Sequence, residues 1–77
     1  MRGESVMKVL GIIGGGKLGR AIARAALTSG WTVLVYDLAP VPELFALVDG
    51  NESAKLVDGP ELAQHSDVIL LAVPFEA

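Results

Sequence analysis

The sequence predicts a three-layer α/β domain built on a parallel β-sheet. Three observations support this prediction: a short apolar run at residues 9–13, a glycine-rich turn directly after it, and a helical pattern that leads into a second strand at residues 32–36. Short, unbroken apolar runs are typical of parallel strands that are covered on both faces. Strand, glycine turn, helix and strand in this order make a βαβ unit with a right-handed crossover.

The helix of this unit is expected to start after the glycines. Apolar and small residues recur at the spacing of one helical face: Leu18, Ile22, Ala25, Ala26 and Ser29. Lys17, Arg20 and Arg24 fall on another face, and we expect the two arginines to be solvated. Gly30 stands where a left-handed C-terminal cap is expected.

The second half of the chain predicts shorter elements. In chain order they are a helix over residues 43–48 with Pro42 at its start, a brief strand over 54–57, a helical turn over 60–65 and a strand over 68–73. The last strand is the strongest of these, because all six of its residues are apolar, and Pro74 stops it. If the brief strand forms, the expected strand order is 3-2-1-4.

Length and composition favour one small domain. The 77 residues are 52% apolar with a net charge of −3, which gives no electrostatic reason to expect nucleic acid or an anionic membrane as a partner. No apolar run is long enough for a signal peptide or a membrane span. The absence of cysteine excludes disulfides and thiolate metal sites and fits a reducing cytoplasm. We expect residues 1–77 to form a single, truncated domain with residues 1–7 as a flexible tail.

The loop Gly14-Gly15-Gly16-Lys17-Leu18-Gly19 has the G-x-G-x-x-G pattern of dinucleotide-binding turns. The pattern alone is a weak signal, but here it follows a predicted buried strand and opens a helix. Gly14 permits the tight turn, Gly16 lets a pyrophosphate approach the backbone, and Gly19 lets the helix pack closely on the strand. The helix N-terminus adds free N–H groups and a partial positive charge.

Asp37 stands at the end of the second predicted strand, 18 residues beyond Gly19. A carboxylate there can accept hydrogen bonds from an adenosine ribose, and it would repel the 2′-phosphate of NADP. Residues 38–42 contain no basic side chain, so the sequence favours NAD. The alternative is that the glycines only make a tight turn and Asp37 caps a loop. A P-loop is excluded, because Arg20-Ala21 follow Gly19 in place of a Lys-Ser/Thr pair.

The stretch from Lys8 to Pro74 resembles the N-terminal NAD(P)-binding domain of a broad oxidoreductase superfamily. The segments that carry the resemblance are LGIIGGGKLGRAIA (residues 10–23), GWTV (30–33) and SDVILLAVP (66–74). Members of the superfamily include F420-dependent NADP reductases, pyrroline-5-carboxylate reductases, prephenate dehydrogenases, and 6-phosphogluconate and 3-hydroxyisobutyrate dehydrogenases. The GKLG loop and the AVP ending favour a resemblance to the F420-reductase-like and prephenate-dehydrogenase-like branches.

This resemblance implies a doubly wound Rossmann-type fold, here partial, and a set of cofactor contacts. It implies that the pyrophosphate is lined by Gly14, Gly16, Lys17, Leu18 and Gly19. It further implies that Asp37 contacts the adenosine ribose, and that Ala72, Val73 and Pro74 contact the nicotinamide-side ribose. Asp37 departs from the F420-dependent reductases, which generally use NADP.

No catalytic set of residues stands out in the sequence. His65 is the only histidine, and it falls in a polar turn before the last strand, away from the ligand-binding ends of the strands, where we expect a surface position. Asp67 is expected to be a polar residue at the start of that strand, and Trp31 to pack against the end of the helix. No pair of carboxylates, Ser/His/Asp set or metal-ligand spacing is visible.

The expected function is therefore to bind a nicotinamide dinucleotide, preferably NAD, as the cofactor domain of an oxidoreductase. In the superfamily, catalytic groups come from later segments and a second domain. Two alternatives stay open: a stand-alone nucleotide-binding or regulatory module without catalysis, and a self-associating fragment without binding. The apolar strand at residues 68–73 predicts a homodimer through its outer edge.

Overall fold

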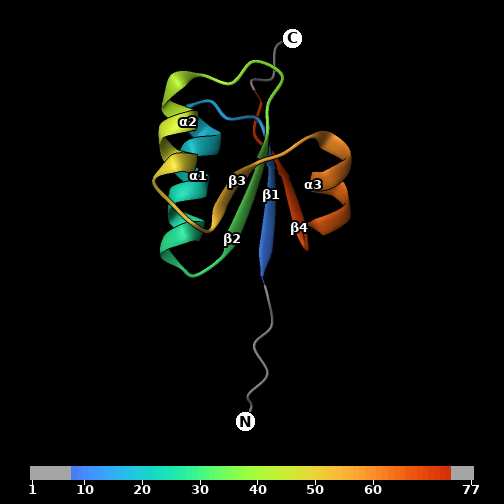
Figure 1. The fold of residues 1–77 in the computed structure, drawn as a ribbon. Helices are drawn as coiled ribbons and strands as arrows, with labels where there is room; N and C mark the ends of the chain where they lie inside the picture. The colour runs from blue at the N-terminus through green and yellow to red at the C-terminus, as the bar shows by residue number, and fades with distance from the viewer. Residues whose placement is uncertain (1–7, 74–77) are drawn as a thin grey trace.

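The computed structural model describes residues 8–73, so the predicted tail at residues 1–7 and the predicted contact of Pro74 lie outside the described residues. Within residues 8–73 there are four strands and three helices (Figure 1). In chain order they are β1 (Val9–Ile13), α1 (Lys17–Thr28), β2 (Thr32–Tyr36), α2 (Pro42–Asp49), β3 (Ala54–Leu56), α3 (Gly59–His65) and β4 (Val68–Leu71).

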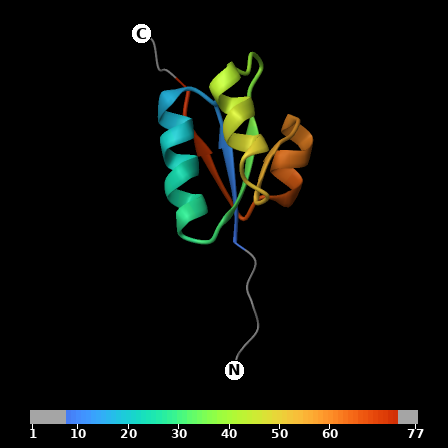
Figure 2. The same cartoon turned by 60° about the vertical axis from the view of Figure 1, so that its left-hand side comes forward.

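The four strands form one parallel sheet in the order β3-β2-β1-β4, as the sequence predicts. Helices α1 and α2 cover one face of the sheet and α3 covers the other (Figures 1 and 2). This confirms the three-layer α/β, partial Rossmann-type fold. No helix in the part of the chain that the structure describes is long and apolar enough to cross a membrane.

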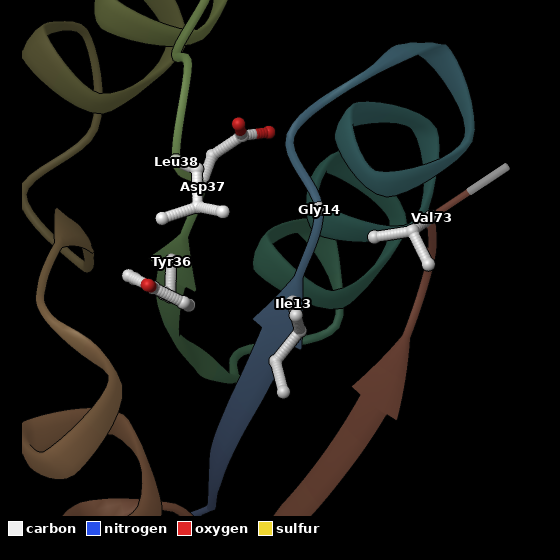
Figure 3. Close-up of a pocket in the computed structure, with 6 residues that line it drawn as sticks. All are labelled: Ile13, Gly14, Tyr36, Asp37, Leu38 and Val73. Carbon is white, nitrogen blue, oxygen red and sulfur yellow. The ribbon is translucent and has the colours of Figure 1, made fainter.

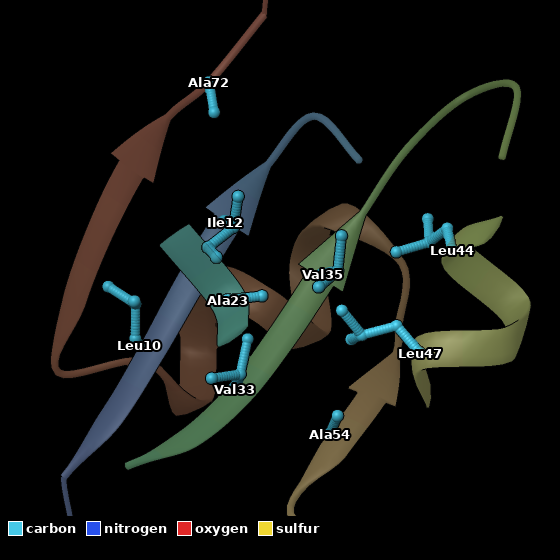
Figure 4. Packing of buried hydrophobic residues seen from close by; sticks show 9 residues of the cluster. All are labelled: Leu10, Ile12, Ala23, Val33, Val35, Leu44, Leu47, Ala54 and Ala72. Carbon is cyan, nitrogen blue, oxygen red and sulfur yellow. The ribbon is translucent and has the colours of Figure 1, made fainter. Parts of the chain in front are cut away.

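The main core lies between the sheet and helices α1 and α2 (Figure 4). Ile12, Val33 and Val35 of the two central strands are at most 1% exposed. They share the cluster with Leu10 of β1 and with buried residues of the neighbouring segments: Ala23, Leu44, Leu47, Ala54 and Ala72. Each large aliphatic side chain buried in this way contributes about 1.5–3 kcal/mol, so the central strands hold the framework that positions the loops.

The opposite face is covered by α3, which begins at a side-chain cap. Asp58 accepts a hydrogen bond from the backbone N–H of Glu61 at 2.8 Å. Leu62 is 1% exposed, and a Cβ added at Gly11 of β1 would lie 2.7 Å from its Cδ2 atom. The missing side chain of Gly11 therefore lets α3 pack directly against β1.

The buried face of α1 differs from the predicted one. Gly19 and Ala23 are its buried residues, whereas Leu18 is 60% exposed. Ala25 and Ser29 are also exposed, whereas Ile22 and Ala26 are partly buried against the core as predicted, so the prediction holds for two residues of the expected face. The physical reason is close packing of the helix on the sheet: α1 presents its smallest residues to the strands, and glycine carries no hydrophobic signal. Gly30 has φ +89°, which confirms the predicted left-handed cap.

Strand β4 is shorter and less covered than the sequence predicts. It ends at Leu71, although the N–H of Ala72 still donates to the carbonyl of Ile13 at 2.8 Å. Its four residues are 38–71% exposed, because among the described residues the helices pack mainly on the other three strands. Strand β4 is also an edge of the sheet within residues 8–73. The apolar side chains of β4 are therefore largely uncovered within residues 8–73.

Candidate functional site

The glycine loop lies at the carboxyl edge of the sheet, between β1 and α1. Gly14 reverses the chain with φ +113°, a conformation that favours glycine. Its N–H donates to the carbonyl of Tyr36 at the end of β2, at 2.9 Å. A Cβ at Gly14 would lie 2.6 Å from the carbonyl oxygen of Ala72. The loop is therefore held between the ends of β2 and β4.

The other two glycines of the motif differ sharply in their surroundings. A Cβ at Gly19 would overlap the carbonyl oxygen of Gly14, so the start of α1 can pack on the loop only with glycine there. A Cβ at Gly16 would meet no atom within 4 Å among the described residues, and its φ of −77° suits any residue. The fold needs glycine at positions 14 and 19, but it does not need glycine at position 16.

The first turn of α1 presents free backbone donors. Gly16 is the N-cap residue without a side-chain cap, and the first turn contains no acidic residue. The first helical hydrogen bond runs from the N–H of Arg20 to the carbonyl of Gly16 at 2.9 Å. The N–H groups of Gly16, Lys17 and Leu18 have no acceptor within residues 8–73. Together with the helix dipole and the Lys17 ammonium, they make this end of α1 attractive to an anion.

Asp37 connects the end of β2 to the glycine loop. One carboxylate oxygen accepts a hydrogen bond from the N–H of Gly15, and the other accepts one from the N–H of Ala39 at 2.8 Å. The carboxylate is directed toward the loop (Figure 3). Each carboxylate oxygen offers about two lone-pair positions, so Asp37 keeps acceptor capacity for further donors.

Arg20 is not the solvated residue that the sequence predicts. Its Nε donates to the carbonyl oxygens of Gly15 and Gly16, at 3.2 and 3.1 Å. Arg24, one turn later, is exposed as expected, and its side chain makes no hydrogen bond within residues 8–73. The prediction failed for Arg20 because the direction of loop carbonyls cannot be read from a pattern of residues.

Two cavities flank the loop. One, of about 190 Å³, lies between the ends of β1, β2 and β4 (Figure 3), and is lined by Ile13, Gly14, Tyr36, Asp37, Leu38 and Val73. The other, of about 220 Å³, is lined by Gly16, Lys17, Leu18, Ala72 and Val73. All the predicted contact residues that the structure describes line one of these cavities, except Gly19, which is buried beneath the loop. Val73 borders both cavities.

Three residues that line the first cavity were not predicted from the sequence. Ile13 ends β1, and Tyr36 and Leu38 flank Asp37 in the sequence. None of them belongs to the glycine motif. Their signal was their position: in a parallel sheet, the residues that end neighbouring strands meet at one edge.

The residues set aside from the site lie at the opposite, amino edge of the sheet. His65 is exposed beside Val9 and Thr32, which start β1 and β2. Asp67 accepts a hydrogen bond from the N–H of Val9 at 2.9 Å, which confirms it as a polar residue at the start of β4. Trp31, which was expected to pack against the end of the helix, packs against the hydrophobic core. Within residues 8–73 no group of three potential metal ligands comes together.

Comparison with known proteins agrees with this arrangement. Residues 9–77 match the model of a family described as NADP oxidoreductase, coenzyme F420-dependent. The chain belongs to this family. The expected resemblance to an NAD(P)-binding oxidoreductase domain is thereby confirmed.

Other relatives of this F420-dependent oxidoreductase family member are dehydrogenases and reductases. The chain is 40% identical to a hydroxypyruvate reductase of Blautia hydrogenotrophica over 67 residues, which are 87% of this chain and 19% of that protein. It is 51% identical to an erythronate-4-phosphate dehydrogenase of Psychrobacter sp. over 65 residues, 84% of this chain and 15% of that protein. The chain thus spans under a fifth of the length of these curated relatives.

Solved structures of a dehydrogenase and a reductase also resemble this chain. A D-lactate dehydrogenase of Escherichia coli superimposes with a TM-score of 0.75 and 34% identity, over 91% of this chain and 21% of that chain. A glyoxylate reductase of Paecilomyes thermophila superimposes with a TM-score of 0.72 and 37% identity, over 91% of this chain and 20% of that chain. The family member described here is therefore a nucleotide-binding domain of the dehydrogenase and reductase type.

Proposed function

We propose that this domain binds NAD, with the ADP half of the cofactor over the glycine loop, and serves as the cofactor domain of an oxidoreductase. The observation that carries this proposal is the open space at Gly16. Gly14 and Gly19 are required by the fold itself, whereas nothing within residues 8–73 approaches the position of a Gly16 side chain. A ligand that lies against the backbone at Gly16 would explain why a side chain is absent at this position.

The chemistry of the loop favours a pyrophosphate as that ligand. The N–H groups of Gly16, Lys17 and Leu18, which have no acceptor within residues 8–73, lie at the positive end of the 12-residue helix α1, together with the Lys17 side chain. A doubly charged diphosphate would accept hydrogen bonds from the amides and be attracted by both charges. The nicotinamide, when bound, supplies hydride transfer, while the residues of this domain bind and orient the cofactor.

The preference for NAD depends on Asp37. Its carboxylate stands beside the cavity that a ribose would enter, and it would repel a 2′-phosphate. Leu38, the next residue, is 88% exposed and uncharged, and no basic residue occurs in 38–42. The family description names NADP, so the proposed preference for NAD rests on Asp37 and on the uncharged residues after it.

On this proposal the nicotinamide side of the cofactor extends toward β4. Ala72 and Val73 line the cavity that also contains Gly16 and Leu18. The exposed side chain of Leu18 then has a partner in the ligand, as does that of Val73, which is 43% exposed. The contact of Pro74 stays a prediction.

Titration calorimetry with ADP-ribose tests the proposal. Gly16→Val places a side chain where the pyrophosphate would lie, so affinity should fall by more than about tenfold, a loss of at least about 1.4 kcal/mol. Circular dichroism should change little, because a Cβ at this position has no described atom within 4 Å. Ala25→Val, on an exposed position of the same helix, is the matched control. Equal affinities of the two variants would place the ligand elsewhere.

We also propose that a second copy of the chain pairs with β4. Its four residues are apolar and at least 38% exposed, and it is an edge of the sheet within residues 8–73. Natural edge strands are usually protected from such pairing by lysine, proline or a bulge, and Val68–Leu71 contains neither lysine nor proline. Antiparallel pairing of two β4 strands about a two-fold axis would satisfy both edges.

A further inference from the structure

The side chain of Arg20 folds back onto the glycine loop from the first turn of α1. Its Nε donates to the carbonyl of Gly15 at 3.2 Å and to that of Gly16 at 3.1 Å. Its backbone N–H also donates to the Gly16 carbonyl, at 2.9 Å. One residue therefore fixes two successive peptide groups of the loop.

Fixing these carbonyls also fixes the direction of the donors behind them. In a trans peptide group the C=O and the N–H of the next residue point in opposite directions. The bond from Arg20 to the Gly15 carbonyl therefore turns the N–H of Gly16 away from the arginine. The bond to the Gly16 carbonyl does the same for the N–H of Lys17. These are two of the amides that have no acceptor within residues 8–73.

We infer that Arg20 is a positioning residue for the anion site: it holds the glycine loop so that the amides of Gly16 and Lys17 face the pyrophosphate. This inference rests on the proposed function and adds a role to a residue outside the glycine motif. The role depends on the hydrogen bonds of Nε to the loop. It does not depend on contact between the positive charge of Arg20 and a phosphate.

Four variants separate these two roles. Arg20→Met removes both the donor and the charge. Arg20→Gln keeps a donor at the position of Nε without the charge, and Arg20→Lys keeps the charge but moves its donor one bond beyond the position of Nε. Arg24→Met is the matched control, because it removes the same charge from an exposed side chain of the same helix without a hydrogen bond in residues 8–73. The ligands are ADP-ribose, which contains the pyrophosphate, and adenosine, which lacks it.

We expect Arg20→Met to weaken ADP-ribose binding by about tenfold relative to Arg24→Met. This is the effect expected from losing the hydrogen bonds that the charged Arg20 side chain donates to the loop. Adenosine binding should change by less than about threefold in either variant. Arg20→Gln should retain most of the ADP-ribose affinity. Equal affinities of Arg20→Met and Arg24→Met would overturn the inference. So would an Arg20→Gln variant as weak as Arg20→Met beside an Arg20→Lys variant that binds normally, because charge would then be the cause.

A second measurement needs no ligand. Backbone ¹⁵N relaxation should give order parameters near about 0.85 for Gly16 and Lys17 in the unmodified protein and in Arg24→Met, and values nearer about 0.6 in Arg20→Met. Unchanged order parameters in Arg20→Met would overturn the role of Arg20. Failure of the unmodified protein to bind ADP-ribose would instead overturn the proposed function, so the two failures are distinguishable.

Discussion

The carboxylate of Asp37 accepts a hydrogen bond from the backbone N–H of Gly15, 22 positions earlier in the chain. The neighbouring residues, Gly14 and Tyr36, are joined by a backbone hydrogen bond of 2.9 Å. The residue proposed to recognise the ribose is thus also a structural support of the loop proposed to bind the pyrophosphate. Changes at Asp37 should therefore affect stability as well as binding.

The first prediction concerns that support. Asp37→Ala leaves the N–H of Gly15 without its carboxylate partner at a partly buried position, so the free energy of unfolding should fall by about 1–3 kcal/mol. Urea unfolding measures this change. Asp49→Ala is the control, because Asp49 is exposed at the end of α2, and its removal should change stability by less than about 0.5 kcal/mol. Equal losses in the two variants would contradict a structural role for Asp37.

A second prediction separates NAD from NADP. The unmodified protein should bind NAD more tightly than NADP. Replacing Asp37 by Ser and Leu38 by Arg should narrow or reverse that preference, because the repulsive carboxylate is removed and a phosphate partner is added. Leu38 is 88% exposed, so the fold should accept arginine there. The matched control is Leu38→Gln alone. Competition titration measures the ratio of the dissociation constants for NAD and NADP. A clear preference of the unmodified protein for NADP would refute the role of Asp37.

Third, the glycines of the loop should differ in their effect on stability. Gly14→Ala forces a side chain into a backbone conformation with φ +113° and against the carbonyl of Ala72, so stability should fall by about 1–3 kcal/mol or more. Gly16→Ala should change stability by less than about 0.5 kcal/mol, because its side chain meets open space. Thermal or urea unfolding of the two variants checks this. A large loss for Gly16→Ala would remove the main argument for a ligand at that position.

The fourth prediction concerns self-association. Light scattering at micromolar concentration should show a dimer of the unmodified protein. Leu71→Lys should shift it toward the monomer, because a charge on an exposed edge strand opposes pairing. Leu38→Lys makes the same exchange at an exposed position outside β4 and should leave the dimer intact. A folded monomer of the unmodified protein, stable on dilution, would contradict pairing through β4.

The local signals of the sequence were sufficient for the order of the elements. The apolar run of β1, the glycine turn and the cap at Gly30 each act within a few residues, so they predicted the βαβ unit and the strand order. The face of α1 was harder to predict. Its buried side is defined by Gly19 and Ala23, whose importance comes from how closely the helix approaches the sheet.

The connections within the candidate site could not be predicted in the same way. The bonds of Arg20 to the loop depend on where the carbonyls of Gly15 and Gly16 lie after the turn at Gly14, which no spacing of residues shows. The bond from Gly15 to Asp37 depends on the register of β1 against β2. The sequence identified the glycines and the acid by their spacing, whereas the contacts between them required the folded chain.

The most direct test of the account is an NMR titration of the protein with ADP-ribose, following backbone amide signals. We propose that the amides at the start of α1 bind the pyrophosphate while Asp37 contacts the ribose. We therefore expect saturable shifts that are largest for Gly16, Lys17 and Leu18, with smaller shifts near Asp37 and little change at the amino edge around His65. Absence of saturable shifts, or shifts centred on the amino edge of the sheet, would contradict it.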